Sequence, residues 1–225
     1  MNLIALLKKR LRLFLKSHEA WHVIAESYGW TRAYREGRPL DTAGNPIPWY
    51  TYPAIEFLRT LDMRECRVFE YGCGNSSVFL ARRVKEIFAA ENDPAWAKEV
   101  GKFNIPNLTI MTATEKEAYV NAPHTFGGKF DIMIVDGRHR KDCAQVAAQL
   151  VRDAGFIIFD NADWYPAACE SIRRQGWLQI DFSGLGPINP YAWTTAIFIR
   201  SSLGVGRLDG VKPMGGNPSG ESSGS

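Results

Sequence analysis

The sequence has few cysteines and no long apolar run, and both absences narrow the class of protein. Only four cysteines occur among 225 residues, and no two of them have the Cys-x-x-Cys spacing of a zinc site. A chain of this length with so few cysteines is also no disulfide scaffold. No apolar run approaches the ~20 residues of a transmembrane helix. The sequence therefore predicts a cytoplasmic protein with reduced thiols.

A strong net charge is also lacking. The formal net charge is +3 at pH 7, charged residues make up 23% of the chain, and hydrophobic residues make up 45%. These are ordinary values for a globular protein, so wholesale disorder is excluded. The positive charge is too small to indicate binding to a nucleic acid, and we expect no nucleic-acid partner.

The chain divides into three zones. Residues 1–63 precede a regular alternation of element types, and we expect them to form a helical N-terminal extension. Residues 64–200 alternate strand-like and helix-like segments. Residues 201–225 are rich in Gly and Ser and nearly free of large apolar side chains, which predicts a disordered tail.

The N-terminal extension begins with an amphipathic pattern. Leu3, Leu7, Leu11 and Phe14 recur at steps of four and three, which places them on one helical face. Basic residues surround that face: Lys8, Lys9, Arg10, Arg12 and Lys16. A basic amphipathic helix can lie on an acidic membrane surface. The same face can instead pack on its own domain or on a second copy of the chain, so peripheral membrane contact and a homodimer both stay open.

The central zone predicts a doubly wound, Rossmann-like α/β fold. Its strand candidates are residues 66–71, 86–91, 108–112, 130–136, 155–160, 178–182 and 194–200. Helical patterns lie between the first five strands, for example at residues 77–84, 94–103 and 141–152. Strands such as residues 132–135 are apolar on both faces, as in parallel sheets covered by helices. We therefore expect a mostly parallel seven-stranded sheet with helices on both faces.

A glycine-rich turn follows the first of these strands. The segment 70–77 reads EYGCGNSS and opens a predicted helix. Glycines allow a tight turn and a close approach to a ligand, and the start of a helix offers free backbone N–H groups. Ser77 stands where the dinucleotide fingerprint has its third glycine, which disfavours NAD.

A second acidic residue, Glu91, closes the next strand, where a carboxylate can accept hydrogen bonds from ribose hydroxyls. Glu-x-Gly-x-Gly followed by such an acid resembles the class I S-adenosylmethionine-dependent methyltransferases over roughly residues 64–200. The resemblance implies S-adenosylmethionine as cofactor, with Glu70, Gly72, Gly74 and Ser76 on its methionine side and Glu91 on its ribose. The alternative is a glycine turn that only permits strand–helix packing.

Polar residues follow the fourth and fifth strands. Asp136 ends one, and Asp160-Asn161 end the other. Because the carboxyl ends of neighbouring parallel strands open into one crevice, we expect these side chains to converge. Their oxygens suit Mg²⁺, which makes Asp136, Asp160 and Asn161 candidate metal ligands. Asp136 also suits a hydrogen bond to the cofactor, and Asp160-Asn161 also suit a strand-end turn.

The same pattern is similar to the metal-dependent O-methyltransferases of the catechol and caffeoyl-coenzyme A types. That resemblance implies a divalent cation that holds a substrate hydroxyl and lowers its pKa. The catechol type has a lysine base three residues after the first aspartate, a position that His139 occupies here. A histidine titrates near neutral pH and could take the proton, so we expect His139 and Asp136 to be catalytic.

Aromatic residues are the candidates for an acceptor pocket or for plain core packing. They are Trp49, Tyr50, Tyr52, Trp164, Tyr165, Tyr191 and Trp193, with Asn189 beside them. Together these observations predict an enzyme that methylates a hydroxyl of a small molecule or glycan with S-adenosylmethionine and Mg²⁺. Two alternatives remain: a metal-independent methyltransferase of another acceptor atom, and a non-catalytic binding module on the same fold.

Overall fold

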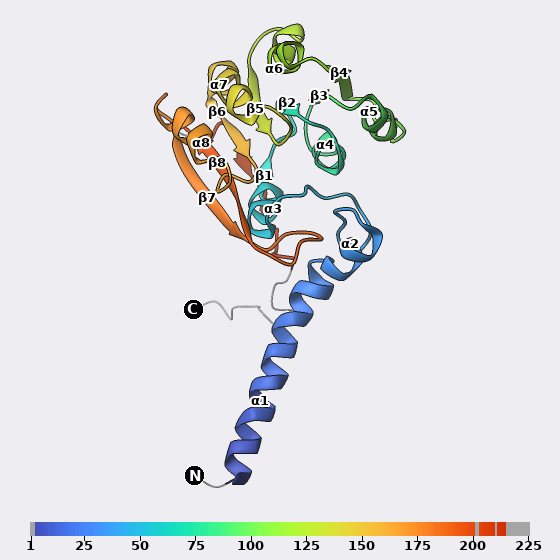
Figure 1. Cartoon of the computed structure of the whole chain (residues 1–225), viewed down its shortest axis with the longest axis vertical. Helices are drawn as coiled ribbons and strands as arrows, with labels where there is room; N and C mark the ends of the chain where they lie inside the picture. Colours follow the sequence, from blue (N-terminus) through green and yellow to red (C-terminus); the bar gives the residue numbers. More distant parts are fainter. Residues whose placement is uncertain (1–2, 201–202, 210, 215–225) are drawn as a thin grey trace.

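A seven-stranded sheet forms the centre of the computed structural model, which describes residues 3–200, 203–209 and 211–214 (Figure 1). The strand order is β4-β3-β2-β5-β6-β8-β7. The strands are β2 (Arg67–Tyr71), β3 (Glu86–Glu91), β4 (Leu108–Thr112), β5 (Phe130–Val135), β6 (Val151–Phe159), β7 (Leu178–Gly184) and β8 (Trp193–Ile199). β8 runs antiparallel to both of its neighbours, and the other neighbouring pairs are parallel. The predicted doubly wound, mostly parallel sheet is confirmed.

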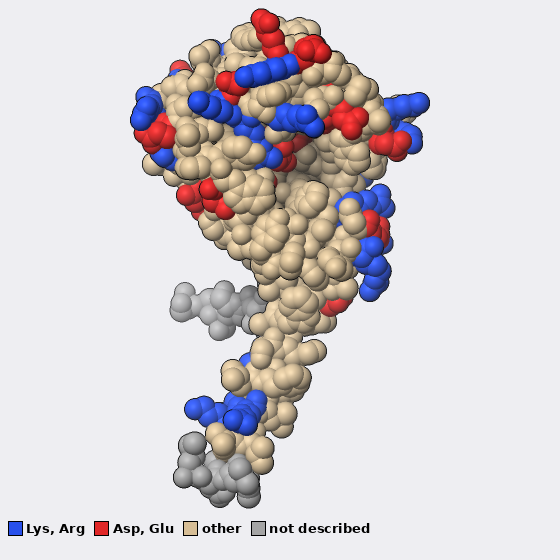
Figure 2. All heavy atoms as spheres, viewed as in Figure 1, with Lys and Arg blue, Asp and Glu red and all other residues tan. Residues whose placement is uncertain are grey.

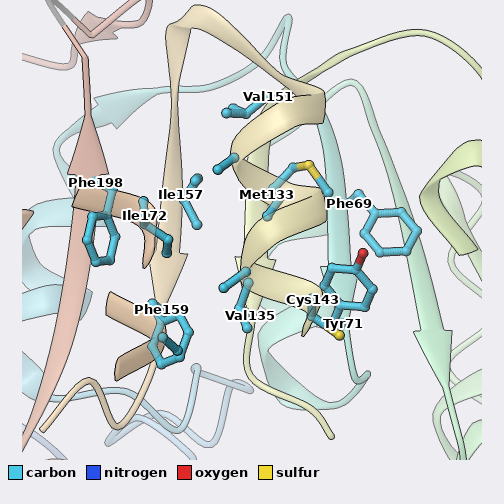
Figure 3. Close-up of a cluster of buried hydrophobic side chains, with 14 of the residues drawn as sticks. Phe69, Tyr71, Met133, Val135, Cys143, Val151, Ile157, Phe159, Ile172 and Phe198 are labelled. Atoms are coloured by element: carbon cyan, nitrogen blue, oxygen red, sulfur yellow. The ribbon is translucent and has the colours of Figure 1, made fainter. Parts of the chain in front are cut away.

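Helices cover both faces of this sheet because its central strands are apolar on both sides. Along β5, Met133 and Val135 belong to one buried cluster, whereas Ile132 and Ile134 belong to the other. Figure 3 shows the first cluster, in which side chains from the sheet meet Cys143 and Ile172. The helices of this cluster are α6 (Lys116–Thr125), α7 (Arg140–Leu150) and α8 (Pro166–Arg173). The opposite cluster is covered by α3 (Tyr52–Arg59) and α4 (Asn75–Ala81), and α5 (Pro94–Gly101) follows β3.

The strand order reverses between β2 and β5, and this point positions the site. β2 pairs in parallel with β3 on one side and with β5 on the other. The chain therefore leaves the ends of these strands in opposite directions, and a crevice opens between the two connections. The glycine turn after β2 and the segment 136–139 after β5 both lie at this edge of the sheet.

The predicted N-terminal extension consists of two different parts. Its first part contains α1 (Leu3–His22), a π-helical turn η1 (Val23–Ser27) and α2 (Trp30–Glu36), and α1 points away from the sheet (Figure 1). Its second part belongs to the sheet core, where Ile55 and Leu58 of α3 are fully buried. Thr51 fixes the entry to α3, because its hydroxyl donates to the Phe182 carbonyl at 2.7 Å.

The predicted disordered tail differs from the structure over its first part. β9 (Gly206–Arg207) pairs antiparallel with β1 (Leu61–Asp62), and Leu203, Val205 and Met214 pack against the core. These few apolar residues are enough to hold the segment on a surface that is itself apolar. The rest of the predicted tail, residues 201–202, 210 and 215–225, lies outside the described residues.

Candidate active site

The glycine turn after β2 is built on one backbone conformation and one close contact. Gly72 has a φ of +94°, a backbone conformation that residues other than glycine rarely adopt. Its N–H donates to the Ala90 carbonyl at 2.8 Å, which ties the turn to β3. Gly137 lies opposite: a Cβ there would be 2.9 Å from the Gly72 nitrogen and would clash with the Tyr119 hydroxyl. The two glycines let the ends of β2 and β5 approach.

Glu70 is buried beneath this turn, at 1% exposure. The Ser76 and Ser77 hydroxyls, both in the first turn of α4, donate to its two carboxylate oxygens at 2.5 Å. Burial raises the pKa of Glu70 from 4.5 to about 8, the two serines oppose that rise, and the nearby Asp136 and Glu91 add to it. A cationic ligand would therefore relieve an unfavourable cluster of negative charge.

Glu91 joins the end of β3 to the glycine turn. One carboxylate oxygen accepts from the backbone N–H groups of Asn92 at 2.8 Å and Asp93 at 2.9 Å, and the other accepts from Cys73 at 3.1 Å. Glu91 therefore has a structural role at the turn, and its binding of a ribose stays a prediction.

These residues line one cavity of about 180 Å³. Its walls are Glu70, Tyr71, Gly72, Cys73, Ser76, Glu91, Asn92, Asp136, Gly137 and Arg138. All the predicted cofactor residues are among them except Gly74, whose N–H donates to the Ser77 hydroxyl at 3.1 Å. The volume is below the ~300–1,000 Å³ typical of small-molecule sites, so a bound cofactor would extend beyond these walls.

The predicted metal ligands converge as expected, but they converge on an arginine. The Arg140 guanidinium donates to Asp136 Oδ1 at 3.0 Å, to Asn161 Oδ1 at 2.9 Å and to the Asp160 carbonyl at 2.5 Å. A cationic side chain therefore fills the place between the three residues. The magnesium prediction is not supported, because a permanent positive charge already binds Asp136 Oδ1 and Asn161 Oδ1 and would repel a second cation there, while the Asp160 carboxylate has other partners.

Asp160 turns its carboxylate toward β8 rather than toward a shared metal position. Trp193 Nε1 donates to Asp160 Oδ1 at 3.1 Å and the Thr195 hydroxyl donates to the same atom at 2.5 Å. Burial and the nearby Asp136 raise the pKa of Asp160 to about 8. Burial also raises the pKa of Asp136, to about 6, and Arg140 limits that rise. Two neighbouring carboxyls thus titrate close to neutral pH.

A second cavity, of about 470 Å³, opens on the other side of Asp136. It is lined by Trp49, Asp136, Arg140, Asp160, Asn161, Trp164, Asn189, Tyr191 and Trp193. Among these aromatics, Trp164 is 54% exposed and Trp193 is 2% exposed, so Trp164 lies at the open side of the cavity and Trp193 in its buried wall. The interpretation of these residues as an acceptor pocket agrees with their position. Tyr50 and Tyr52 belong instead to the buried core.

His139 does not line either of these two cavities. It precedes α7 with a φ of +51°, is exposed, and packs its ring edge-on against Tyr119 with 6.1 Å between centroids. The structure therefore separates His139 from Asp160 and the aromatic cavity, and its predicted role as base has no geometric support. The backbone turn at Gly137 is the reason, because it points residue 139 toward α6.

Sequence reasoning missed the part played by Arg140 and Thr195. Asp136 precedes α7, whose first residue is Arg140, and the non-helical segment between them brings the two side chains within 3.0 Å. Trp193 and Thr195 are two apart on β8, which places both on the face toward Asp160. The alternation along β8 was present in the sequence, although it does not identify Asp160 as the partner without the strand order.

Solved structures provide the comparison with known proteins. The chain is similar to a precorrin-6y C5,15-methyltransferase from Geobacter metallireducens GS-15, with a TM-score of 0.53 and 14% identity over 66% of this chain and 87% of that one. It is also similar to a fibrillarin pre-rRNA processing protein from Methanococcus jannaschii, with a TM-score of 0.53 and 12% identity over 67% and 74%. A third similar structure is a TehB-like SAM-dependent methyltransferase from Corynebacterium glutamicum, with a TM-score of 0.50 and 13% identity over 78% of this chain and 98% of that one.

The chain has the class I methyltransferase fold. No protein family model and no curated protein matches the sequence. At these identities the likeness concerns the fold alone, so the resemblance to metal-dependent O-methyltransferases is not shown.

The raised pKa of Glu70 makes stability depend on pH in a defined direction. The folded protein holds the Glu70 proton more tightly than the unfolded chain, with a pKa of about 8 against 4.5. The associated stability is present below pH 4.5 and is lost as the pH rises through about 8. Glu70→Gln has no carboxyl to ionise there and so does not lose this stability. The Tm of the variant minus the Tm of the wild type should therefore increase by several degrees as the pH rises from 4.5 to about 8. Thermal unfolding without ligand measures it; Glu117→Gln, an exposed site, is the control. A pH-independent Tm difference for Glu70→Gln would contradict the assignment.

Proposed function

We propose that the protein transfers the methyl group of S-adenosylmethionine to a hydroxyl of a small, polyhydroxylated acceptor without a metal ion. The observation that carries this proposal is the position of Asp136. It lines both the acidic cavity beneath the glycine turn and the aromatic cavity beyond it. A methyl donor in the first cavity and an acceptor in the second would therefore meet beside one carboxylate.

The acidic cavity suits the charge of the donor. S-adenosylmethionine carries a positive sulfonium and a positive ammonium, and Glu70, Glu91 and Asp136 surround the cavity with carboxylates. Buried carboxylates with raised pKa values ionise more readily when a cation binds beside them. Gly72 and Gly137 line the same cavity, and we expect Glu91 Oε2 to accept from a ribose hydroxyl as well as from the Cys73 N–H.

The aromatic cavity suits a sugar or a similar acceptor. Trp49, Trp164 and Tyr191 offer flat apolar surfaces with polar tips. Asn161, Asn189 and Asp160 add amide and carboxyl groups that can bond to several hydroxyls. A pocket with both kinds of wall matches a ligand that has apolar faces and hydroxylated edges.

Asp136 is proposed as the group that takes the proton. The cofactor supplies an electrophilic methyl carbon; as the acceptor oxygen bonds to it, the carbon–sulfur bond breaks and the hydroxyl proton passes to the Asp136 carboxylate. Burial raises the pKa of Asp136 while Arg140 opposes that rise, so its carboxylate is a stronger base than that of an exposed aspartate. Arg140 holds the carboxylate in place at 3.0 Å. Positioning of the two reactants supplies much of the remaining rate.

A calorimetric titration with S-adenosylhomocysteine tests the donor site. We expect a Kd on the order of micromolar, about −8 kcal/mol. Neither a chelator nor added Mg²⁺ should change it, since Arg140 fills the metal position. Glu91→Gln should weaken binding by about tenfold or more, because a hydrogen bond to a charged group is lost. Glu117→Gln is the control. Absence of binding to the folded wild-type protein would overturn the proposal and favour the non-catalytic module.

The proton acceptor is tested by turnover. Release of S-adenosylhomocysteine from S-adenosylmethionine is measured over a panel of sugars and other hydroxylated small molecules. With an active acceptor, Asp136→Asn should lower kcat by about 10²–10⁴-fold, the usual worth of a general base. His139→Ala should keep near wild-type turnover because His139 lines neither cavity. Full activity in Asp136→Asn, or a comparable loss in His139→Ala, would contradict this assignment.

A further inference from the structure

Helix α1 leaves its apolar face uncovered. The helix spans 20 residues and extends away from the sheet domain (Figure 1). Leu11 is 60% exposed, Leu13 is 70% exposed and Phe14 is 65% exposed, values far above those of apolar residues that pack on a domain. Within the described residues, nothing that belongs to the sheet domain covers this part of the helix. The prediction that α1 packs on its own domain is therefore not met.

Most of the uncovered apolar residues lie on a different side of the helix from the basic residues. Leu7, Leu11 and Phe14 follow each other at steps of four and three, which keeps them on one side. Lys8, Arg12 and Lys16 follow each other at steps of four on another side, with Lys9 near them and Leu13 four residues after Lys9. Arg10 lies at the edge of the apolar side, from which its long side chain can reach outward, and His18 lies on that side four residues after Phe14. Figure 2 shows basic side chains gathered toward the free end of α1.

The positive charge of α1 is largely uncompensated. Its 20 residues contain five Lys or Arg residues and one acid, Glu19, which pairs with Lys16 at 2.6 Å. Among the described residues, no ion pair involves Lys8, Lys9, Arg10 or Arg12. An apolar stripe beside a row of free positive charges matches the chemistry of a bilayer surface with anionic lipids.

We propose that α1 docks on an anionic membrane surface, parallel to the bilayer. Its apolar side would enter the boundary between headgroups and acyl chains, and its basic side would lie among negative headgroups. No helix among the described residues is long and apolar enough to cross a membrane, so the helix binds the surface rather than spans it. The proposal is independent of the methyl-transfer chemistry.

A second copy of the chain is a poorer occupant for the same face. The basic residues of α1, from position 8 to position 16, are centred on the helix itself. Two copies would therefore oppose one basic segment with another in a parallel pair and also in an antiparallel pair. Such like-charge contacts destabilise a dimer, whereas an anionic bilayer removes the repulsion.

The base of α1 connects this surface with the aromatic cavity. Trp21 packs edge-on against Trp30, with 5.6 Å between ring centroids. Trp30 Nε1 in turn donates to the Asn189 carbonyl at 3.1 Å, and Asn189 lines the aromatic cavity. A docked α1 would hold that cavity close to the membrane surface.

Vesicle sedimentation with the full chain tests the docking. Vesicles of phosphatidylglycerol and phosphatidylcholine in equal parts are compared with vesicles of phosphatidylcholine alone. At moderate salt, we expect the protein to bind the anionic vesicles and not the vesicles of phosphatidylcholine alone. Leu11→Ser with Phe14→Ser should lower the partition coefficient by about tenfold or more, because two buried apolar side chains are lost. Lys8→Gln with Lys9→Gln should lower it about fivefold for each charge.

Matched controls separate the helix from general surface effects. Leu178→Ser removes a leucine of similar exposure, 58%, on β7, and Lys98→Gln with Lys129→Gln removes two other exposed lysines. Both controls should bind vesicles like the wild type, and circular dichroism confirms that each variant folds. Equal binding by the α1 variants and the wild type would overturn the proposal. The proposal would also be overturned if the wild-type protein did not bind anionic vesicles and instead formed a dimer through α1, as measured by light scattering.

Discussion

One guanidinium holds the ends of two neighbouring strands together. Arg140 donates to Asp136, Gly137, Asp160 and Asn161, which brings the residues after β5 and the residues after β6 to a common centre. A buried charge of this kind requires full hydrogen bonding, and these acceptors provide it. The positions of Asp136 between the two cavities and of the glycine turn beside it both follow from that arrangement.

The fold could be predicted from the sequence because its signals are local. Strands that are apolar on both faces, such as β5, must be buried on both faces, which is typical of a parallel sheet covered by helices. The turn EYGCGNSS between a strand and a helix adds the position of the crevice. Glu70, Gly72, Ser76 and Glu91 line one cavity for the same reason, since strand ends in a parallel sheet share an edge, and their binding of a cofactor stays a prediction.

The chemistry of the site was harder to predict, because it depends on which side chain fills a shared space. Two aspartates and an asparagine at strand ends match a metal site and an arginine site equally well in sequence. Only the arrangement in space shows Arg140 among them. His139 lies away from both cavities for a related reason: a spacing of three residues from Asp136 does not determine the direction of a side chain in a non-helical segment. The pattern of α1 predicted a helix, but the same pattern serves a domain core, a dimer or a membrane.

Asp136 lies at the boundary between the proposed donor and acceptor cavities. A crystal structure of the protein with S-adenosylhomocysteine tests this position most directly. We expect the sulfur to lie beside Asp136 and to face the cavity formed by Trp49, Trp164 and Tyr191, while the ribose contacts Glu91. A ligand bound with its sulfur turned away from Asp136, or bound outside the cavity beneath the glycine turn, would contradict it.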